Sequence, residues 1–204
     1  MTIVVKLGGS LGGSPLLDAW LQALDGSGQR MVIVPGGGPF ADAVRLAQGR
    51  LGFDDAAAHK MALLAMAQFG LALASRCANC RMASTASAIK AALAEWRLPV
   101  WMPLTMAGAA SDIPASWDIT SDSLAAWLAG RIGARRLMLV KQVDAPHGDI
   151  PASDLATQNI VDPAFPGFLA RSGAQAWIAG PGALAGARAA LANGSMPGQR
   201  ITLP

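Results

Sequence analysis

Near its start the chain reads Val4-Val5-Lys6-Leu7-Gly8-Gly9-Ser10, a short apolar run that carries one lysine and ends in two glycines and a serine. The β-branched valines favour a buried strand that ends at Gly8. Glycines after a strand let backbone N–H groups approach an anion, and a following helix directs its positive end to the same point. We therefore predict a phosphate- or anion-binding turn in which Lys6 supplies a positive charge.

The same pattern occurs a second time at Met31–Val34, an apolar run followed by Pro35-Gly36-Gly37-Gly38 and by a proline suited to the first position of a helix. Glycines after one strand also make plain tight turns. Two such loops close together in the sequence are stronger evidence for a ligand site, because parallel sheets hold ligands at the carboxyl ends of their strands. The pair therefore favours an anion site over two unrelated turns.

Strands and helices alternate along the rest of the chain, without a repeat or an obvious linker. We expect helices at 15–24, 39–48, 55–75, 85–96, 124–132, 163–171 and 181–191, and strands at 98–102, 137–140, 176–179 and 200–203. Asp54 and Asp55 fit the cap of the 55–75 helix. Segment 103–114 is expected to be the longest irregular one. This order predicts an α/β fold, a three-layer αβα sandwich on a mainly parallel sheet, in a single domain 1–204.

The composition raises the question of a membrane protein, since 52% of the residues are hydrophobic and the mean hydropathy is +0.37. The longest uncharged helical interval, between Lys60 and Arg76, holds 15 residues, fewer than the roughly 18 needed to span a bilayer. The chain also begins with a strand pattern rather than a signal peptide. We expect a cytoplasmic protein that does not bind a membrane.

The charge argues against nucleic acid as a partner. The net charge is only +3, the basic residues are scattered, and aromatic residues make up 5% of the chain with no tyrosine. A surface for stacking bases is therefore not expected. This weak positive charge suits small anionic substrates.

Several side chains allow a structural reading beside a functional one. Cys77 and Cys80 form a single CxxC with no second pair, so we expect two thiols one helical turn apart and no metal held by protein ligands. His59 lies in the first turns of a helix, where histidines are more often structural than catalytic. Ser121 and Asp122 precede a helix and could be caps alone.

With these residues in view, the chain resembles the amino acid kinase family, which includes acetylglutamate, aspartate, uridylate and isopentenyl phosphate kinases. Three motifs carry the resemblance in the family's order: Lys6–Ser10, Pro35–Gly38 and Thr120-Ser121-Asp122-Ser123. The resemblance implies the carbamate kinase-like fold, ATP with Mg²⁺ as cofactors, and a homo-oligomer, dimer or higher, to which the apolar 55–75 helix would contribute.

The resemblance also implies roles for individual residues. Lys6 would contact the phosphoryl group in transit and Asp122 would organise that lysine. The residues implied to bind ATP are Gly8, Gly9, Ser10, Lys141 and Asp144, and those implied to bind the acceptor are Gly36, Gly37, Gly38, His59 and Ser121.

Within the family the chain is most similar to the small kinases of methanofuran-type one-carbon cofactor biosynthesis. That similarity extends through 58–60, 116–124 and 165–166. The implied acceptor is itself a phosphate, so no general base is required, because a phosphate oxygen is already ionised at neutral pH. Two alternatives stay open: a kinase of this family with another phosphate or carboxylate acceptor, and a non-catalytic binding or regulatory subunit.

The chain departs from the family in the segment Lys141–Asp149, where relatives have Thr-Asp-Val-Asp-Gly followed by an apolar residue and Tyr. Asp144 is retained, but Ala145 stands where relatives have glycine. Relatives also carry a second lysine late in the chain, where this chain offers only Arg171. Lys141 could substitute for that lysine or could face solvent, and the sequence leaves both open.

Overall fold

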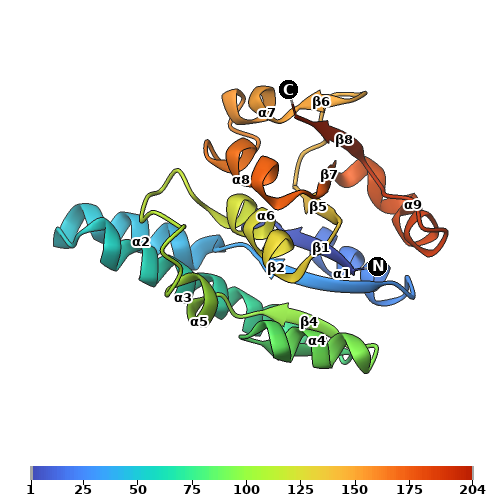
Figure 1. Ribbon diagram of the computed structural model, residues 1–204, viewed down its shortest axis with the longest axis horizontal. Coiled ribbons are helices and arrows are strands. Elements are labelled where there is room, and N and C mark those ends of the chain that lie inside the picture. The colour runs from blue at the N-terminus through green and yellow to red at the C-terminus, as the bar shows by residue number, and fades with distance from the viewer. Residues whose placement is uncertain (1, 204) are drawn as a thin grey trace.

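The first strand, β1 (Thr2–Leu7), lies in the middle of an eight-stranded sheet in this computed structural model, which describes residues 2–203 (Figure 1). The strand order is β3 (Cys80–Ala83), β4 (Leu98–Trp101), β2 (Arg30–Pro35), β1, β5 (Arg136–Val140), β7 (Gln175–Ala179), β8 (Gln199–Thr202) and β6 (Ile150–Pro151). All neighbours pair in parallel except β7 and β8. The mainly parallel sheet is therefore confirmed.

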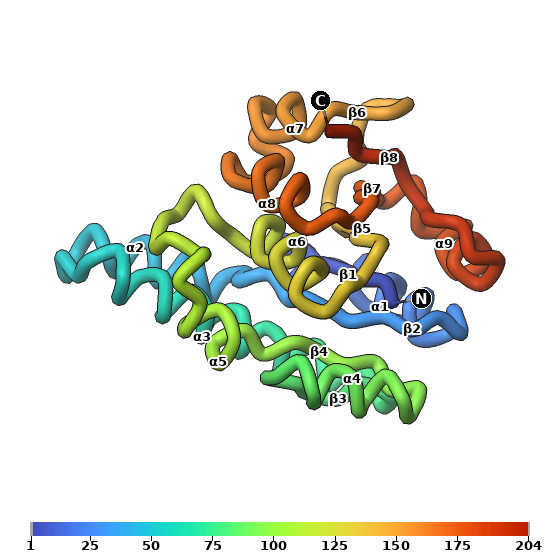
Figure 2. The backbone as a smooth tube through the Cα atoms, in the orientation of Figure 1, coloured from blue at the N-terminus to red at the C-terminus, as the bar shows by residue number. Residues whose placement is uncertain are grey.

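Helices cover both faces of this sheet, as Figures 1 and 2 show. Buried side chains of α1 (Pro15–Asp25) and α9 (Pro181–Ala192) pack on one face. Those of α4 (Ala86–Ala94), α6 (Ser121–Ile132), α7 (Ala152–Thr157) and α8 (Phe165–Ser172) pack on the other. The predicted three-layer αβα sandwich is confirmed.

A pair of helices, α2 (Gly38–Leu51) and α3 (Asp55–Ser75), extends beyond the sheet on the left of Figure 1. The bounds of α3 are those predicted, and the Asp54 side chain caps it by accepting from Ala57 N at 2.7 Å. By length and composition α3 could cross a membrane. Here, however, α3 packs against the sheet. Its buried Leu63 belongs to the hydrophobic core on one side of the sheet, and its buried Phe69 belongs to the core on the other side.

Short elements were not foreseen from the sequence. Segment 103–114 was expected to be irregular, yet it contains the short helix α5 (Leu104–Ala107). The strands β3 and β6 and the helix α7 were missed as well. β6 has only two residues, and the two middle residues of β3, Arg81 and Met82, are both exposed, so neither strand shows an alternation of buried and exposed side chains.

The prediction that Cys77 and Cys80 lie one helical turn apart is wrong. Cys77 follows the end of α3, and Cys80 is the first residue of β3. Both thiols are buried and free, and burial together with the neighbouring Cys77 raises the pKa of the Cys80 thiol. A raised pKa makes Cys80 a poor nucleophile, and both side chains pack in the core on the α1 side of the sheet.

Candidate active site

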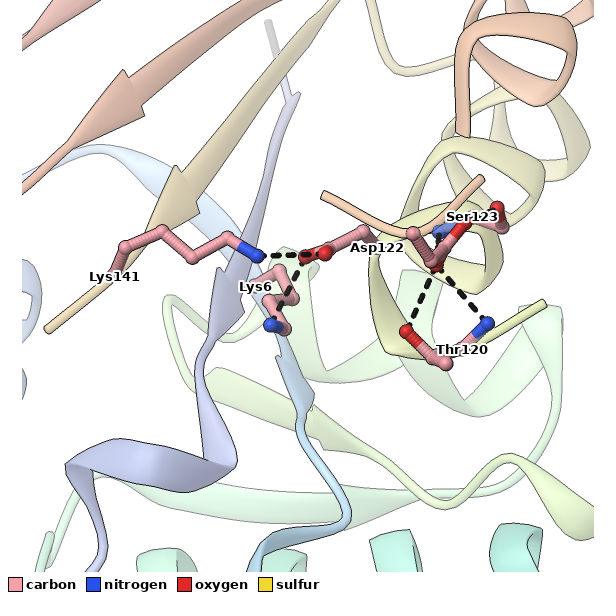
Figure 3. A network of polar contacts seen from close by, with 6 residues as sticks. Lys6, Thr120, Asp122, Ser123 and Lys141 are labelled. Atoms are coloured by element: carbon pink, nitrogen blue, oxygen red, sulfur yellow. Dashed lines mark hydrogen bonds and ion pairs between the residues drawn. The ribbon is translucent and has the colours of Figure 1, made fainter. Parts of the chain in front are cut away.

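Three charged side chains meet where β1 and β5 end, as Figure 3 shows. The Asp122 carboxylate lies between two lysines: its Oδ1 is 2.9 Å from Lys6 Nζ, and its Oδ2 accepts a hydrogen bond from Lys141 Nζ at 2.6 Å. The contact with Lys6 is an ion pair without the alignment of a hydrogen bond. All three side chains are largely buried.

The period of the strands explains why these residues meet. Side chains alternate between the faces of a strand, and Val5 and Leu7 join the core on the α1 side whereas Val4 joins the core on the α6 side. Lys6 therefore points toward α6, which carries Asp122 in its first turn. By the same alternation Leu139 in β5 faces α6, so Lys141, two residues later, does so too.

Burial and charge act against each other in this cluster. Burial alone would raise the pKa of the Asp122 carboxyl, but the charges of Lys6 and Lys141 outweigh it and hold the pKa below its usual value. Burial, together with the charge of Lys6, lowers the pKa of Lys141 to about 8. The cluster therefore holds a carboxylate and two amines, one of which titrates close to physiological pH.

The two glycine loops touch each other beside this cluster. A Cβ on Gly9 would lie 2.2 Å from Gly38 N, and one on Gly36 would lie 2.3 Å from Gly9 N. These distances are far below any van der Waals contact, so no side chain fits at either position. Gly38 also has a φ of 54°, in the left-handed region that favours glycine. Glycine is therefore required here for close approach of two backbones.

The backbone N–H groups of the two loops are not equivalent. Gly8 N donates to Val140 O at 3.1 Å and Gly36 N to Leu7 O at 2.8 Å, so both continue the sheet. Within residues 2–203 the N–H groups of Gly9 and Ser10 have no backbone acceptor, since they begin the 3-10 turn η1 (Gly9–Leu11). An anion could thus be held by Gly9 and Ser10, but not by Gly8 or Gly36.

A cavity of about 580 Å³ opens beside the charged cluster and joins most of the sequence-predicted residues. Its wall includes Lys6, Gly9, Ser10, Gly37, Gly38, His59, Ser121, Asp122 and Lys141. The Nε2 atom of His59 is buried without a hydrogen-bond partner among the described residues, and burial lowers the pKa of this imidazole. His59 thus lines the cavity and carries one unsatisfied polar atom just beneath its surface.

Two of the predicted residues lie elsewhere. Asp144 lines a separate cavity of about 320 Å³, and its Oδ1 accepts a hydrogen bond from Gly182 N at 2.9 Å in the first turn of α9. Arg171, the other candidate for the family's second lysine, stacks over the Phe168 ring at 4.4 Å and does not line the main cavity. Of the two candidates, Lys141 is the one beside Asp122.

The sequence did not reveal other residues of the cavity wall. Asp162 is buried and accepts hydrogen bonds from Thr120 and Ser123 at the start of α6. Asp42 on α2 and Trp117 also line the cavity. Asp162 lies 42 residues from Thr120 along the chain, so no local pattern could have paired them.

Metal binding by the protein alone finds no support in the described part of the chain. No group of three or more His, Cys, Asp or Glu side chains within residues 2–203 could hold an ion. Both oxygens of Asp122 face lysines.

Comparison with known proteins finds relatives that cover most of the chain. The model of the amino acid kinase family matches residues 1–145. A curated relative, the [5-(aminomethyl)furan-3-yl]methyl phosphate kinase of Methanocaldococcus jannaschii, is 27% identical over 186 residues, which cover 86% of each chain.

Solved structures with the same fold cover nearly the whole chain. The uridylate kinase of Archaeoglobus fulgidus has a TM-score of 0.74 at 17% identity and covers 99% of this chain and 100% of its own. The UMP kinase of Ureaplasma parvum has a TM-score of 0.72 at 16% identity over 99% and 98%. An isopentenyl phosphate kinase has a TM-score of 0.60 at 17% identity over 98% and 100%. The predicted amino acid kinase fold is confirmed.

Proposed function

The chain belongs to the amino acid kinase family and is a small-molecule kinase, and we propose that it transfers a phosphoryl group from ATP to [5-(aminomethyl)furan-3-yl]methyl phosphate. The product would be the diphosphate, in methanofuran-type one-carbon cofactor biosynthesis. The observation that carries the proposal is the lysine–aspartate–lysine cluster at the contact of two glycine loops.

The proposed reaction is one displacement at phosphorus. An ionised oxygen of the acceptor phosphate forms a bond to the γ-phosphorus of ATP, and the bond from that phosphorus to the β–γ bridging oxygen breaks. ADP leaves with the electron pair, and no proton has to move. The residues then need only to align two anions and to neutralise the charge on the transferred group.

We assign the neutralisation to Lys6 and Lys141. Their amines are 2.9 Å and 2.6 Å from the two oxygens of the Asp122 carboxylate, so Asp122 fixes the positions of both amines. Preorganised charge of this kind stabilises a transition state without reorganising during the reaction. Lys141 would thereby act as the family's second lysine, from a different place in the sequence.

The two glycine loops would divide the phosphates between them. We propose that the N–H groups of Gly9 and Ser10 bind the phosphates of ATP, and that Gly37, Gly38, His59 and Ser121 bind the acceptor. The contact between Gly9 and Gly38 supports this, because it brings the two groups of donors next to each other. Gly8 and Gly36 would shape the turns, since their N–H groups belong to the sheet.

The second cavity is our candidate for the nucleoside of ATP. It lies at the ends of β5 and β7 and includes Asp144, His147 and the start of α9. Lys141 follows β5 directly, so a nucleotide in this cavity could extend its phosphates toward the charged cluster. Mg²⁺ would enter bound to those phosphates.

The outer wall of the main cavity supports an acceptor that carries an amine. Asp42 lines this wall, and within residues 2–203 no cation lies within 4 Å of its carboxylate. Trp117 lies on the same wall, and its Nε1 donates to Gln48 Oε1 at 2.6 Å. An ammonium group suits Asp42, and an aromatic ring suits Trp117, although the Arg45 guanidinium lines the same cavity and covers one face of the Trp117 ring at 4.5 Å.

Release of ADP with purified protein, ATP and Mg²⁺ tests the proposal. We expect turnover with the aminomethylfuran phosphate and much less with UMP or isopentenyl phosphate. Turnover with one of the other acceptors alone would leave the kinase and replace the substrate. No turnover with any acceptor, and no binding of ATP–Mg²⁺ by calorimetry, would favour a non-catalytic binding or regulatory subunit.

The variant Lys6→Ala should lose about 100-fold or more in kcat, because one preorganised charge at a transition state contributes about this factor. Lys90→Ala, which removes an exposed amine from α4, is the matched control. A fully active Lys6→Ala variant would contradict the role given to Lys6.

We further propose that residues 1–204 act as a single cytoplasmic domain, without nucleic acid or membrane as partners, and that the chain forms a homo-oligomer, dimer or higher. Support for the oligomer comes from exposed apolar side chains on α2 and α3, namely Phe40, Leu46, Leu51, Met61, Leu64 and Leu71.

A further inference from the structure

The first turn of α6 is held by a carboxylate from a distant part of the chain. A helix leaves its first N–H groups without partners, and they are usually capped by a nearby Ser, Thr, Asp or Asn. The side chain of the N-cap residue Thr120 makes no such bond. Instead, Asp162 Oδ2 accepts from Thr120 N at 3.0 Å, Thr120 Oγ1 at 2.8 Å and Ser123 N at 3.0 Å, and Asp162 Oδ1 accepts from Ser123 Oγ.

These four bonds bracket Asp122. Thr120 and Ser123 stand on either side of it in the sequence, so fixing both fixes the backbone that directs the Asp122 carboxylate toward the lysines (Figure 3). Ser121, Asp122 and Ser123 are buried, Ser123 fully so, and Thr120 is half-buried. A small rotation of this turn would move the carboxylate away from one or both amines.

Burying the carboxyl group of Asp162 costs free energy that a neutral helix cap would not. It is 7% exposed, and burial together with the nearby charge of Asp122 raises the pKa of its carboxyl. A neutral side chain could cap a helix without bringing a second carboxylate near Asp122. Asp162 differs from an ordinary cap because its two oxygens hold the residues on both sides of Asp122 at once.

We propose that Asp162 is a positioning residue, which holds the first turn of α6 so that Asp122 spans Lys6 and Lys141. The inference rests on the proposed function, since the turn matters to catalysis only if the cluster transfers phosphate. Asp162 itself donates no charge to the reacting groups, because both of its oxygens are occupied by the turn.

Two substitutions separate geometry from charge. Asp162→Asn keeps the four contacts if its oxygen takes the place of Oδ2 and its amide nitrogen donates to Ser123 Oγ, which as a hydroxyl can also accept. Asp162→Ala removes all four. Asp112→Ala is the matched control, because Asp112 also bonds to α6, through Trp127 and Arg131, but far from the first turn and outside the cavity.

Steady-state kinetics should show a loss in kcat rather than in KM. We expect Asp162→Ala to lower kcat about 100-fold, the usual effect of misplacing a catalytic group by about 1 Å, with KM changed less than about threefold. Asp162→Asn should stay within about fivefold of the wild type and Asp112→Ala within about twofold, since each leaves the turn in place. Equal losses in Asp162→Ala and Asp112→Ala, or in Asp162→Ala and Asp162→Asn, would overturn the proposal.

If Asp162→Ala does not fold, Ser123→Ala tests the same idea, because it removes only one of the four bonds from a residue that does not line the cavity. We expect a loss in kcat of about tenfold, between those of the other variants. Wild-type kcat in Ser123→Ala would count against the proposal.

Acetylation of lysines, measured by peptide mass spectrometry, provides a readout that needs no turnover. Release of Asp122 from its bridge should raise the labelling of Lys6 and Lys141 several-fold in Asp162→Ala, or in Ser123→Ala to a smaller extent, and not in Asp112→Ala. Unchanged labelling would overturn the inference even in an active enzyme. An inactive wild type with the expected labelling would instead overturn the proposed function alone.

Discussion

The charge of the Lys141 amine depends on pH near neutrality, because the amine is both buried and close to a second amine. Its charge is retained through Asp122, whose carboxylate it shares with Lys6. The lowered pKa, about 8, means that the free enzyme holds two positive charges at neutral pH but loses one in mild alkali. A role for this charge therefore predicts a pH dependence.

We expect kcat/KM to be level below pH 8 and to fall about tenfold per pH unit above it, because kcat/KM reports the pKa values of the free enzyme. The corresponding fall in kcat should occur at higher pH, since bound phosphates favour the protonated form of the Lys141 amine. In Lys141→Arg the guanidinium stays charged, so the alkaline limb should disappear from this range even if the rate is lower. An unchanged limb in Lys141→Arg would assign it to another group.

The lowered pKa of Lys141 has the opposite effect on the stability of the folded chain, which should increase with pH. The pKa of Lys141 is lower in the folded chain than its ordinary value of 10.5, so the unfolded chain binds this proton more tightly. The contribution of Lys141 to stability therefore increases as the pH rises from about 8 toward 10.5. Activity and stability should diverge over this range, which a urea titration at several pH values would detect.

Asp42 makes the identity of the acceptor testable. Asp42→Asn removes the charge that we assign to the ammonium group and leaves the shape of the wall. We expect KM for the aminomethylfuran phosphate to rise about 2- to 5-fold, the range of a partly exposed ion pair, and KM for the same phosphate without its aminomethyl group to stay constant. Equal changes for both acceptors would show that Asp42 does not recognise the amine.

At the scale of elements, the contact between the two glycine loops couples the β1 side of the site to the start of α2. A methyl group on Gly9 would meet Gly38 N at 2.2 Å, and both partners are backbone that cannot rotate away. The loops would have to separate, and with them the two proposed phosphate sites. A change at this contact should affect both stability and binding.

Gly9→Ala should therefore lower the free energy of unfolding by about 1–3 kcal/mol, the usual cost of overpacking. Affinity for ATP–Mg²⁺ should fall in parallel. Gly49→Ala is the matched control, because nothing lies within 4 Å of its added methyl group, and in a helix it should stabilise by about 0.5–1 kcal/mol. Urea denaturation and calorimetry measure both, and wild-type values for Gly9→Ala would show that the loops can part at no cost.

The elements that the sequence predicted well are those with a local signal. Gly8 to Ser10 and Gly36 to Gly38 follow β-branched strands, and α3 has both a capping Asp54 and 21 helical residues. The strand period even directs Lys6 and Lys141 to one face. The sequence could not predict contacts between residues that lie far apart along the chain. Ser121 and Asp122 resembled helix caps, whereas the residue that caps α6 is Asp162, which only folding brings next to them. Likewise the sequence grouped Asp144 with the residues expected to bind ATP, but it could not show that Asp144 lines a second cavity beside α9.

At the scale of the molecule, α2 and α3 present apolar side chains at the end of the fold where they extend past the sheet (Figure 1). Phe40 on α2 and Met61 and Leu64 on α3 are 36–45% exposed and line a hollow of about 380 Å³ between the two helices. Exposed apolar side chains grouped in this way commonly mark an interface. The active-site cavity uses Gly38 and His59 from the same two helices, so association here would also stiffen the site.

We therefore expect the protein to associate through this face, and Leu64→Glu to dissociate it, because a charge buried in the centre of an interface is not compensated. Met82→Glu, on the edge strand β3, is the control, since it changes another exposed apolar side chain, 58% exposed against 45% for Leu64, away from α2. Analytical ultracentrifugation at micromolar concentration should show an oligomer for the wild type and Met82→Glu and a monomer for Leu64→Glu. A monomeric wild type would contradict the proposed oligomer, and an oligomer that survives Leu64→Glu but not Met82→Glu would move the interface to the β3 edge. Lower kcat in monomeric Leu64→Glu, restored at high protein concentration, would connect association to the cavity wall that α2 and α3 supply.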